Sequence, residues 1–400
     1  MKFLPKNWIL IPLGDCCQII SGSTPKRNKP EYWGGDIPWV TPKDLGKLKT
    51  PVLKDAPEKI TEAGYKSCST TLLPQGSILF SSRAPIGYVA IAGRPMCTNQ
   101  GFKSLVPNEY VHSPYLYWCM RKYASDIEAL GSGTTFKEVS KGIVERFIIP
   151  LPPLEEQRRI AAILDKADGV RRKRKEAIRL TDELLKSTFL EMFGDPVTNP
   201  KGWEVRELGD CVKDIESGWS PKCDTRQAEP EEWGVLKLGA VTYGHFNPDE
   251  NKAMLPDDVP RQELEIKTGD LLVTRKNTYE LVGASAFVQM TRPKLMLPDL
   301  IFRLRLIDGI DPVYVWQTLS QKTMRLKLSG LAGGTAGSMP NISKARLRTL
   351  PFPVPPQLLQ LKYREIFNQF WLKKEHQKES EEISENLFNS LLQKAFRGEL

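Results

Sequence analysis

Histidine is scarce in this chain of 400 residues, which contains only three, at positions 112, 245 and 376. Their wide separation argues against a histidine-based catalytic triad and against a metal site built on clustered histidines. The seven cysteines form no Cys-x-x-Cys pair, so neither a zinc site nor a disulfide framework is expected. This pattern predicts a reduced protein of the cytoplasm.

Long apolar runs and common catalytic motifs are also missing. No stretch reaches the roughly 18 consecutive apolar residues that a membrane-spanning helix needs. Residues 1–14 are interrupted by Pro5 and Pro12 and lack a small-residue cleavage site, so we expect no signal peptide. The sequence contains no GxxxxGKS/T phosphate loop, no GxGxxG segment opening a helix and no GxSxG turn. We therefore predict that this chain is not an enzyme by itself.

Positive charge is unevenly distributed along the chain. The formal net charge is +9 and the pI is ≈ 9.0, which favours a polyanionic partner. Residues 1–154 carry 19 Lys and Arg against 12 Asp and Glu, whereas residues 197–355 carry 21 against 20. A binding surface in the second half must therefore depend on how its charges are arranged.

The sequence contains two copies of one plan. Three motifs occur twice: WxxxxLGDC at Trp8 and Trp203, SGxxPK at Ser21 and Ser217, and a proline-rich segment at 149–153 and 352–356. Each copy predicts a mixed α/β unit in which short β-rich runs alternate with Gly/Pro turns. The expected strands are 78–81, 88–92, 102–106, 271–274, 284–288 and 301–306. One amphipathic helix is expected in each copy, near 114–129 and 312–328.

Each copy is followed by a long segment with helical periodicity, over 153–195 and 356–400. The first has an apolar stripe that includes Ile160, Leu164 and Val170, and the second has one that includes Ile383 and Leu387. Each helix would be about 60 Å long. A solitary helix of this length needs a partner, so we expect the two to pair as an antiparallel coiled coil. The alternative is that each helix folds back onto its own domain.

Glycine-containing turns supply the best candidates for DNA contact. Their hydroxyl, amide and cationic side chains suit phosphates and base edges. In the first copy the candidates are Ser21, Ser23, Thr24, Lys26, Arg27, Lys43, Arg83, Asn99, Gln100, Lys103, Thr134 and Thr135. In the second copy they are Ser217, Trp219, Ser220, Lys222, Arg275, Lys276, Asn277, Thr335 and Asn341. The alternative for each is a satisfied turn or a surface ion pair.

Two further features favour a structural interpretation. The basic run at 171–175 would point all around a helix axis, which is typical of a solvated helix or of a contact with a partner protein. Tryptophans recur at matching places in the two copies, including Trp8, Trp39 and Trp203. Such recurrence favours core packing over base stacking.

Together these motifs resemble those of the specificity (S) subunits of type I restriction-modification systems. The resemblance rests on the duplicated WxxxxLGD start, SGSTPKR at 21–27, DIPWVTPKDL at 36–45, NQGF at 99–102, GSGTT at 131–135, IPLPPLEEQ at 149–157 and FRGEL at 396–400. It covers the whole chain. In the second copy it is looser, because Trp219 replaces a small residue and no clear NQGF-like segment follows.

The resemblance implies an α/β (α+β) protein with two target-recognition domains, 1–152 and 196–355. Each would read one half of a bipartite DNA target. Residues 153–195 and 356–400 would be spacer helices that separate the half-sites by one or two duplex turns of about 34–36 Å each. They would also dock the modification (methyltransferase) subunits. S-adenosylmethionine, ATP and Mg are expected on these and on the restriction subunits, with no cofactor bound by this chain.

Two other functions remain open from the residues alone. A non-enzymatic coiled-coil adaptor with protein-binding globular ends fits the nearly neutral second copy. An RNA-binding repeat protein would use exposed aromatic residues and prefer single strands. Binding to duplex DNA that weakens steeply with salt would favour the DNA-binding hypothesis over both.

Overall fold

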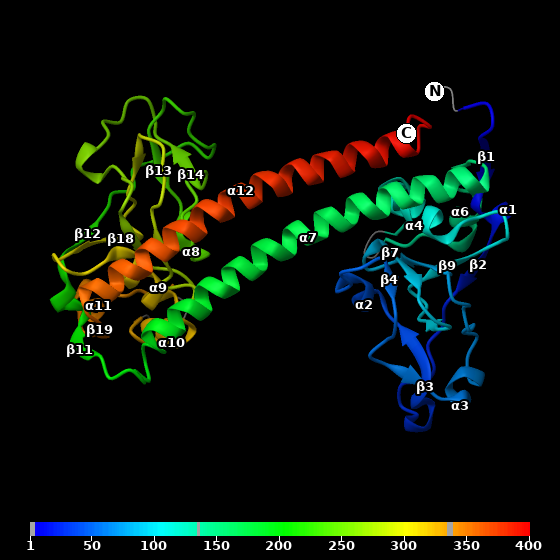
Figure 1. Ribbon diagram of the computed structural model, residues 1–400, viewed down its shortest axis with the longest axis horizontal. Helices are drawn as coiled ribbons and strands as arrows, with labels where there is room; N and C mark the ends of the chain where they lie inside the picture. The colour runs from blue at the N-terminus through cyan, green and yellow to red at the C-terminus, as the bar shows by residue number, and fades with distance from the viewer. Residues whose placement is uncertain (1–4, 134–136, 334–338) are drawn as a thin grey trace. The chain divides into compact units, whose positions relative to one another are not determined.

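The computed structural model describes residues 5–133, 137–333 and 339–400. Contacts divide the chain into two compact units. Unit 1 comprises Met1–Ala177 together with Gln377–Leu400, and unit 2 comprises Ile178–His376. Each unit has its own sheets and its own apolar core (Figure 1).

Unit 1 contains a five-stranded sheet of order β2-β9-β6-β7-β4, a three-stranded sheet of order β5-β3-β8 and a β1-β10 ribbon. The strands are β1 (Ile9–Pro12), β2 (Cys17–Ser21), β3 (Trp33–Val40), β4 (Val52–Leu53), β5 (Lys59–Ile60), β6 (Ile78–Ser82), β7 (Ile86–Ala92), β8 (Cys97–Thr98), β9 (Lys103–Pro107) and β10 (Ile148–Leu151). The short helices are α1 (Leu13–Cys16), η1 (Pro30–Tyr32), α2 (Pro42–Gly46), α3 (Glu62–Lys66), α4 (Ser113–Lys122), α5 (Ala124–Ala129) and α6 (Lys141–Arg146).

Unit 2 contains a four-stranded sheet of order β12-β18-β15-β16, a three-stranded sheet of order β14-β13-β17 and a β11-β19 ribbon. The strands are β11 (Glu204–Glu207), β12 (Val212–Ser217), β13 (Gly234–Leu236), β14 (Asn251–Ala253), β15 (Leu271–Thr274), β16 (Ser285–Phe287), β17 (Leu295–Met296), β18 (Ile301–Leu306) and β19 (Pro351–Val354). The short helices are η2 (Leu208–Cys211), α8 (Gly239–Thr242), η3 (Gln262–Leu264), α9 (Pro312–Ser320), α10 (Lys322–Gly330) and α11 (Lys344–Arg348).

The predicted strands are confirmed. They correspond to β6, β7 and β9 in unit 1 and to β15, β16 and β18 in unit 2. Every residue of β6 and β15 is buried, which explains why these runs are apolar throughout rather than alternating. Of the recurring tryptophans, Trp8 and Trp39 are buried and Trp203 is half-buried.

The prediction of one amphipathic helix per copy is wrong, because each is two short helices. In unit 1, α4 ends before Tyr123 and α5 begins after it. In unit 2, Gln321 separates α9 from α10 and has ψ near 139°, an extended conformation. A residue with that backbone cannot continue the hydrogen-bonded helical turns. The apolar periodicity of the sequence continues across this residue, so it does not indicate where the helix is interrupted.

The two long helices are α7 (Leu154–Phe193) and α12 (Gln357–Ala395) (Figure 1). Within unit 1, Arg171 of α7 donates to Glu385 of α12 at 2.9 Å, and Arg159 donates to the Leu400 carbonyl at 2.8 Å. Within unit 2, Lys374 donates to Asp182 at 2.6 Å. The earlier residue of α7, Arg159, contacts the later residue, Leu400, and the later residue, Arg171, contacts the earlier one, Glu385. The two helical segments of unit 1 therefore run antiparallel to each other.

The predicted apolar stripe is partly wrong. Ile160 and Leu164 of α7 are fully buried in the unit 1 core, as expected, but Val170 is 45% exposed. On α12, however, Ile383 and Leu387 are 68% and 56% exposed, whereas Phe388 is only 2% exposed. Consecutive residues of a helix are rotated by about 100° around its axis. Leu387 therefore points away from the core that its neighbour Phe388 enters.

A buried glutamine joins each long helix to its unit. In unit 1, the Gln157 amide oxygen accepts from the His112 amide at 2.8 Å, and its amide nitrogen donates to the Pro152 carbonyl at 2.8 Å. In unit 2, the Gln360 oxygen accepts from the Asp311 amide at 2.9 Å, and its nitrogen donates to the Pro355 carbonyl at 2.8 Å. Each glutamine therefore links the start of its long helix to the start of a domain helix.

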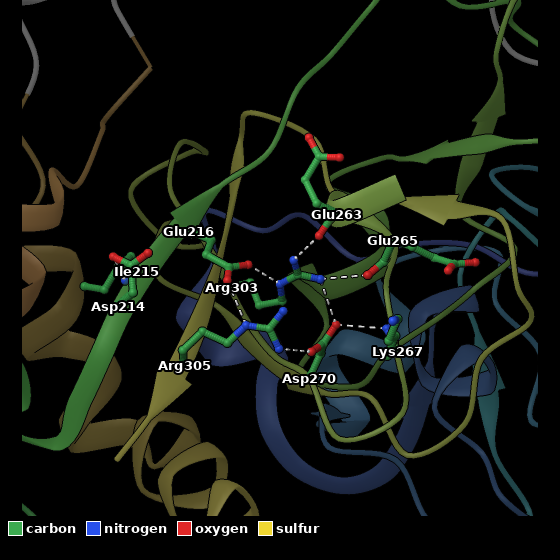
Figure 2. Close-up of polar contacts among 9 residues, drawn as sticks. All are labelled: Asp214, Ile215, Glu216, Glu263, Glu265, Lys267, Asp270, Arg303 and Arg305. Atoms are coloured by element: carbon green, nitrogen blue, oxygen red, sulfur yellow. Dashed lines mark hydrogen bonds and ion pairs between the residues drawn. The ribbon is translucent and has the colours of Figure 1, made fainter. Parts of the chain in front are cut away.

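Unit 2 also contains a buried ion-pair network (Figure 2). The Arg303 side chain is 1% exposed and donates to Glu216 at 2.6 Å and to Asp270 at 3.2 Å. It also donates to the backbone carbonyls of Glu263 and Glu265 at 2.8 and 2.7 Å. Arg305 donates to the same two carboxylates at 2.8 and 3.0 Å. The network ties β12 and β18 to η3 and to the loop before β15.

Removing the Gln360 amide should destabilise unit 2. We expect Gln360→Ala to cost about 1–3 kcal/mol, because it leaves buried backbone groups at Asp311 and Pro355 without this partner. Hydrogen exchange of the Asp311 amide and thermal unfolding of the full chain measure the effect. Gln357→Ala, an exposed position in the same helix turn, is the control. Equal losses for the two variants would contradict the assigned role.

The stability of unit 2 should depend on the charge of Glu216. Burial alone would raise the pKa of Glu216, but hydrogen bonds from Arg305 and Arg303 outweigh it and hold the pKa below its ordinary value of 4.5. Its stabilising contribution is therefore present above pH 4.5 and is lost as the pH falls through the lowered pKa. In unfolding measurements across acidic pH, Glu216→Gln should show a shallower loss of stability than the unsubstituted chain.

The control for this titration is Glu263→Gln. Glu263 contributes its backbone carbonyl to Arg303, and its side chain points away from the guanidinium (Figure 2). This variant should retain the acid-induced loss. A Glu216→Gln profile that matches the unsubstituted chain would rule out the titration.

Candidate nucleic-acid interface

In unit 1, the predicted glycine turn after β2 lies against the loop between β8 and β9. The Ser23 amide donates to the Thr98 carbonyl at 3.0 Å, and the Thr24 hydroxyl donates to the Gln100 side-chain oxygen. A Cβ atom on Gly22 would lie 2.0 Å from the Asn99 carbonyl oxygen. Only glycine permits this approach, so Gly22 brings the two predicted segments together.

The amide side chains of this loop are held differently. The Asn99 side-chain oxygen accepts from the Gly101 amide at 2.9 Å, so this oxygen maintains the turn. Gln100 is exposed, and Thr24 orients its oxygen. An oriented, exposed amide can pair with adenine through its donor and its acceptor. Gln100 is therefore better placed than Asn99 to contact a base.

The cations of the unit 1 site fall into two groups. Lys26 and Lys43 are exposed, and Lys43 lies in the first turn of α2. Arg27 is stacked on aromatic rings: its guanidinium carbon lies 4.0 Å from the Trp33 ring centre. Glu58 accepts from Arg27 at 2.8 Å. These contacts orient Arg27 while leaving 54% of its side chain exposed.

Arg83 and Lys103 share one acid. The Arg83 guanidinium lies 3.8 Å from the Glu138 carboxylate, and the Lys103 ammonium lies 3.5 Å from it. The Lys103 side chain is only 11% exposed. Its geometry therefore fits a structural cation better than a direct DNA contact, whereas Arg83 is 37% exposed beside the loop. Ser21 is exposed at the end of β2.

Unit 2 has a similar contact made by different residues. A Cβ atom on Gly218 would lie 1.9 Å from the Leu297 carbonyl oxygen, and the Trp219 amide donates to that oxygen at 3.0 Å. The Ser220 hydroxyl donates to the Asp299 carboxylate at 2.5 Å. The turn after β12 is thereby held against the loop before β18.

Asp299 and Arg261 were not among the predicted site residues. The Arg261 guanidinium carbon lies 4.4 Å from the Trp219 ring centre. Asp299 lies three residues before Phe302, which pairs with Ser217, just as Gln100 lies three residues before Lys103, which pairs with Ser21. Searching for a residue position relative to the following strand, rather than for an NQGF motif, would have found Asp299.

The remaining candidates in unit 2 are mostly engaged within the fold. The Arg275 guanidinium donates to the Asn341 side-chain oxygen at 3.1 Å. Asn277 is 6% exposed and donates to the Thr242 hydroxyl at 3.2 Å. Lys276 is half-buried and forms a β-bridge with Asn341. These contacts favour a role in shaping the site.

The other candidates are either exposed or outside the described residues. Lys222 is exposed and Ser217 is half-buried at the end of β12. Thr134, Thr135 and Thr335 lie outside the residues that the structure describes.

The basic run on α7 is largely engaged in ion pairs. Asp168 accepts from both Arg171 and Arg172 at 2.6 Å, and Lys175 lies 3.5 Å from Glu385. These contacts keep the helix pair of unit 1 together, in agreement with the structural interpretation of this run.

The described residues contain neither a candidate metal cluster nor a candidate membrane span. No group of three or more His, Cys, Asp or Glu side chains there could hold a metal ion. In the same part of the chain, no helix is long and apolar enough to cross a membrane.

The chain is similar to several known proteins. Residues 5–180 match the family described as Type I restriction modification DNA specificity domain. The chain is 40% identical over 235 residues to the type I restriction enzyme MjaIX specificity subunit of Methanocaldococcus jannaschii. That match covers 54% of each chain, so it spans about half the length of this relative.

Two more distant matches extend over nearly the whole chain. The EcoKI specificity subunit of Escherichia coli K12 is 24% identical over 421 residues, covering 99% of this chain and 90% of that protein. The crystal structure of a type I restriction-modification S subunit from M. genitalium is similar with a TM-score of 0.60 and 14% identity. It covers 98% of this chain and 96% of that chain, and at this identity it shows the fold alone.

Residues 5–180, less than half of the chain, are thus similar to type I restriction modification DNA specificity domains. The resemblance of the chain to type I specificity subunits, predicted from its motifs, is confirmed. The adaptor alternative is not favoured by these matches.

The glycine turns should not tolerate a side chain. We expect Gly22→Ala to destabilise unit 1 by about 1–3 kcal/mol, because the added carbon meets backbone oxygens of Thr98 and Asn99. Gly169→Ala, within α7 where the added carbon meets nothing within 4 Å, is the control. Thermal unfolding of the full chain measures both. A Gly22→Ala protein as stable as the control would contradict the close approach.

Proposed function

We propose that this chain is the DNA-binding specificity subunit of a type I restriction-modification complex, in which each unit reads one half of a bipartite target. The observation that carries the proposal is the glycine turn held against a pre-strand loop in both units. The turns are linked to the loops by Thr24 and Gln100 in unit 1 and by Ser220 and Asp299 in unit 2. Similar backbone arrangements thus present different polar groups.

Because the two units present different polar groups, the two halves of the DNA target should differ in sequence. An exposed glutamine amide suits adenine, whose edge offers one donor and one acceptor in the major groove. A carboxylate such as that of Asp299 accepts a hydrogen bond from the cytosine amino group. We propose that unit 1 reads adenine through Gln100 and that unit 2 reads cytosine through Asp299.

The domain assignment follows from this function. Residues 1–152 and 196–355 would be the target-recognition domains of a two-copy repeat. Residues 153–195 and 356–400 would be spacer helices that pair as an antiparallel coiled coil. The antiparallel contacts of α7 and α12 within unit 1, and the contact of Lys374 with Asp182 in unit 2, support this assignment.

Catalysis would belong to partner subunits. We propose that this chain has no catalytic centre and acts in the cytoplasm with modification (methyltransferase) and restriction subunits. S-adenosylmethionine, ATP and Mg would be bound by those subunits. The named relatives are specificity subunits of restriction enzymes, which supports a division of labour of this kind.

Selection of bound duplexes from a randomised pool by the full chain tests the reading of bases. Gln100→Ala should reduce adenine preference in one half-site, and Asp299→Asn should reduce cytosine preference in the other. A bidentate contact is worth about 1–3 kcal/mol, so the adenine preference should fall roughly 5- to 150-fold in Gln100→Ala. The other half-site should remain unchanged in each case.

Exposed residues of the same types provide matched controls. Gln75→Ala in unit 1 and Asp308→Asn in unit 2 should leave both half-sites unchanged. If either test variant alters both half-sites, the assignment of one half to each unit is wrong. If the unsubstituted chain shows no salt-dependent duplex binding, the DNA-binding proposal itself fails.

A further inference from the structure

A cleft in unit 1 lies outside all of the predicted contact residues. It has a volume of ≈ 340 Å³ and is bordered by α2 and the segment after it, by β7, by α4 and by α7. Its charged lining consists of four cations, Lys49, Arg121, Arg171 and Arg172, and one acid, Asp168. An excess of positive charge in a concave site favours an anionic ligand.

The single acid positions two of the cations. Asp168 has a side chain that is only 2% exposed, and it accepts from Arg171 and Arg172 at 2.6 Å each. Arg171 also donates to Glu385 and is 13% exposed, so it is mostly committed to the fold. Arg172 is 39% exposed. Asp168 therefore holds the Arg172 guanidinium at the cleft while neutralising only part of the positive charge.

The opposite side of the cleft supplies further donors. Arg121 is exposed and donates to the Tyr117 hydroxyl at 3.1 Å, which orients its guanidinium. Lys49 is exposed, and Tyr88 is 40% exposed. Arginine, lysine and tyrosine are side chains that commonly donate to the oxygens of a phosphodiester.

Helix α2 connects the cleft to the candidate interface. A Cβ atom on Gly101, in the predicted contact loop, would lie 3.2 Å from Pro42 at the start of α2. At the other end of the helix, a Cβ atom on Gly46 would lie 3.0 Å from the Tyr88 ring. The five residues of α2 span about 7.5 Å, which corresponds to about two base steps of 3.4 Å.

We propose that this cleft binds a backbone phosphate of duplex DNA beside the bases that unit 1 reads. The proposal rests on the DNA-binding function proposed above. The continuity through α2 favours DNA over an acidic segment of a partner protein, because α2 places the cleft about two base steps from the loop that is proposed to contact the bases. The contact would strengthen binding without distinguishing between sequences.

The test is the salt dependence of duplex binding by the full chain carrying Lys49→Gln, Arg121→Gln or both. Each lost phosphate contact should reduce the magnitude of the slope of log K against log salt concentration by about 0.9. The double variant should bind on the order of tenfold more weakly at moderate salt. The selected sequence should be the same as for the unsubstituted chain, since these residues read no bases.

Lys66→Gln, which removes an exposed charge from α3, is the matched control and should leave the slope nearly unchanged. If the double variant keeps the unsubstituted slope, the cleft does not bind DNA and the proposal is overturned. A slope that changes together with the selected bases would also overturn it, because the cleft would then contribute to sequence reading.

Two additional measurements identify other ligands. If the double variant keeps the slope but loses stabilisation by inorganic phosphate in thermal unfolding, the site takes a free anion. If it keeps the slope but loses co-purifying subunits, the site takes an acidic protein segment. Either result overturns the DNA assignment while leaving the proposed function intact. Absence of salt-dependent duplex binding by the unsubstituted chain would instead overturn both.

Discussion

A buried glutamine in the first turn of each long helix fixes that helix to its own unit. Gln157 and Gln360 each use both ends of one amide, accepting from the start of a domain helix and donating to a proline carbonyl. A shorter or charged side chain could not satisfy a donor and an acceptor at once. The glutamine therefore sets the direction in which each long helix leaves its own unit.

Each unit presents its polar groups where a turn lies directly against a loop, and this close approach requires glycine. Gly22 and Gly218 allow a turn to lie directly against a loop, so the geometry of the contact depends on backbone atoms. The side chains at its edge can then differ, as Gln100 and Asp299 do, without disturbing the arrangement.

Ion pairing within the fold, more than the composition of a segment, determines which cations remain available at the surface. In unit 2, Arg303 is buried in ion pairs with Glu216 and Asp270, so this cation is not available at a binding surface. In unit 1, Asp168 holds Arg172 at a cleft where positive charge remains in excess. The net charge of a segment therefore indicates the class of partner but does not locate the surface that meets it.

The strands β6, β7, β9, β15, β16 and β18, the two long helices and the glycine turns could be predicted from the sequence alone, because periodicity and backbone preference act locally. The sequence also carried the resemblance to specificity subunits. Three features became known only from the fold. Lys103 is buried beside Glu138, and Phe388 rather than Leu387 faces the core. Asp299 lies in the contact loop, where it accepts a hydrogen bond from Ser220. These outcomes depend on neighbours distant in the chain, whose positions no local pattern of residues records.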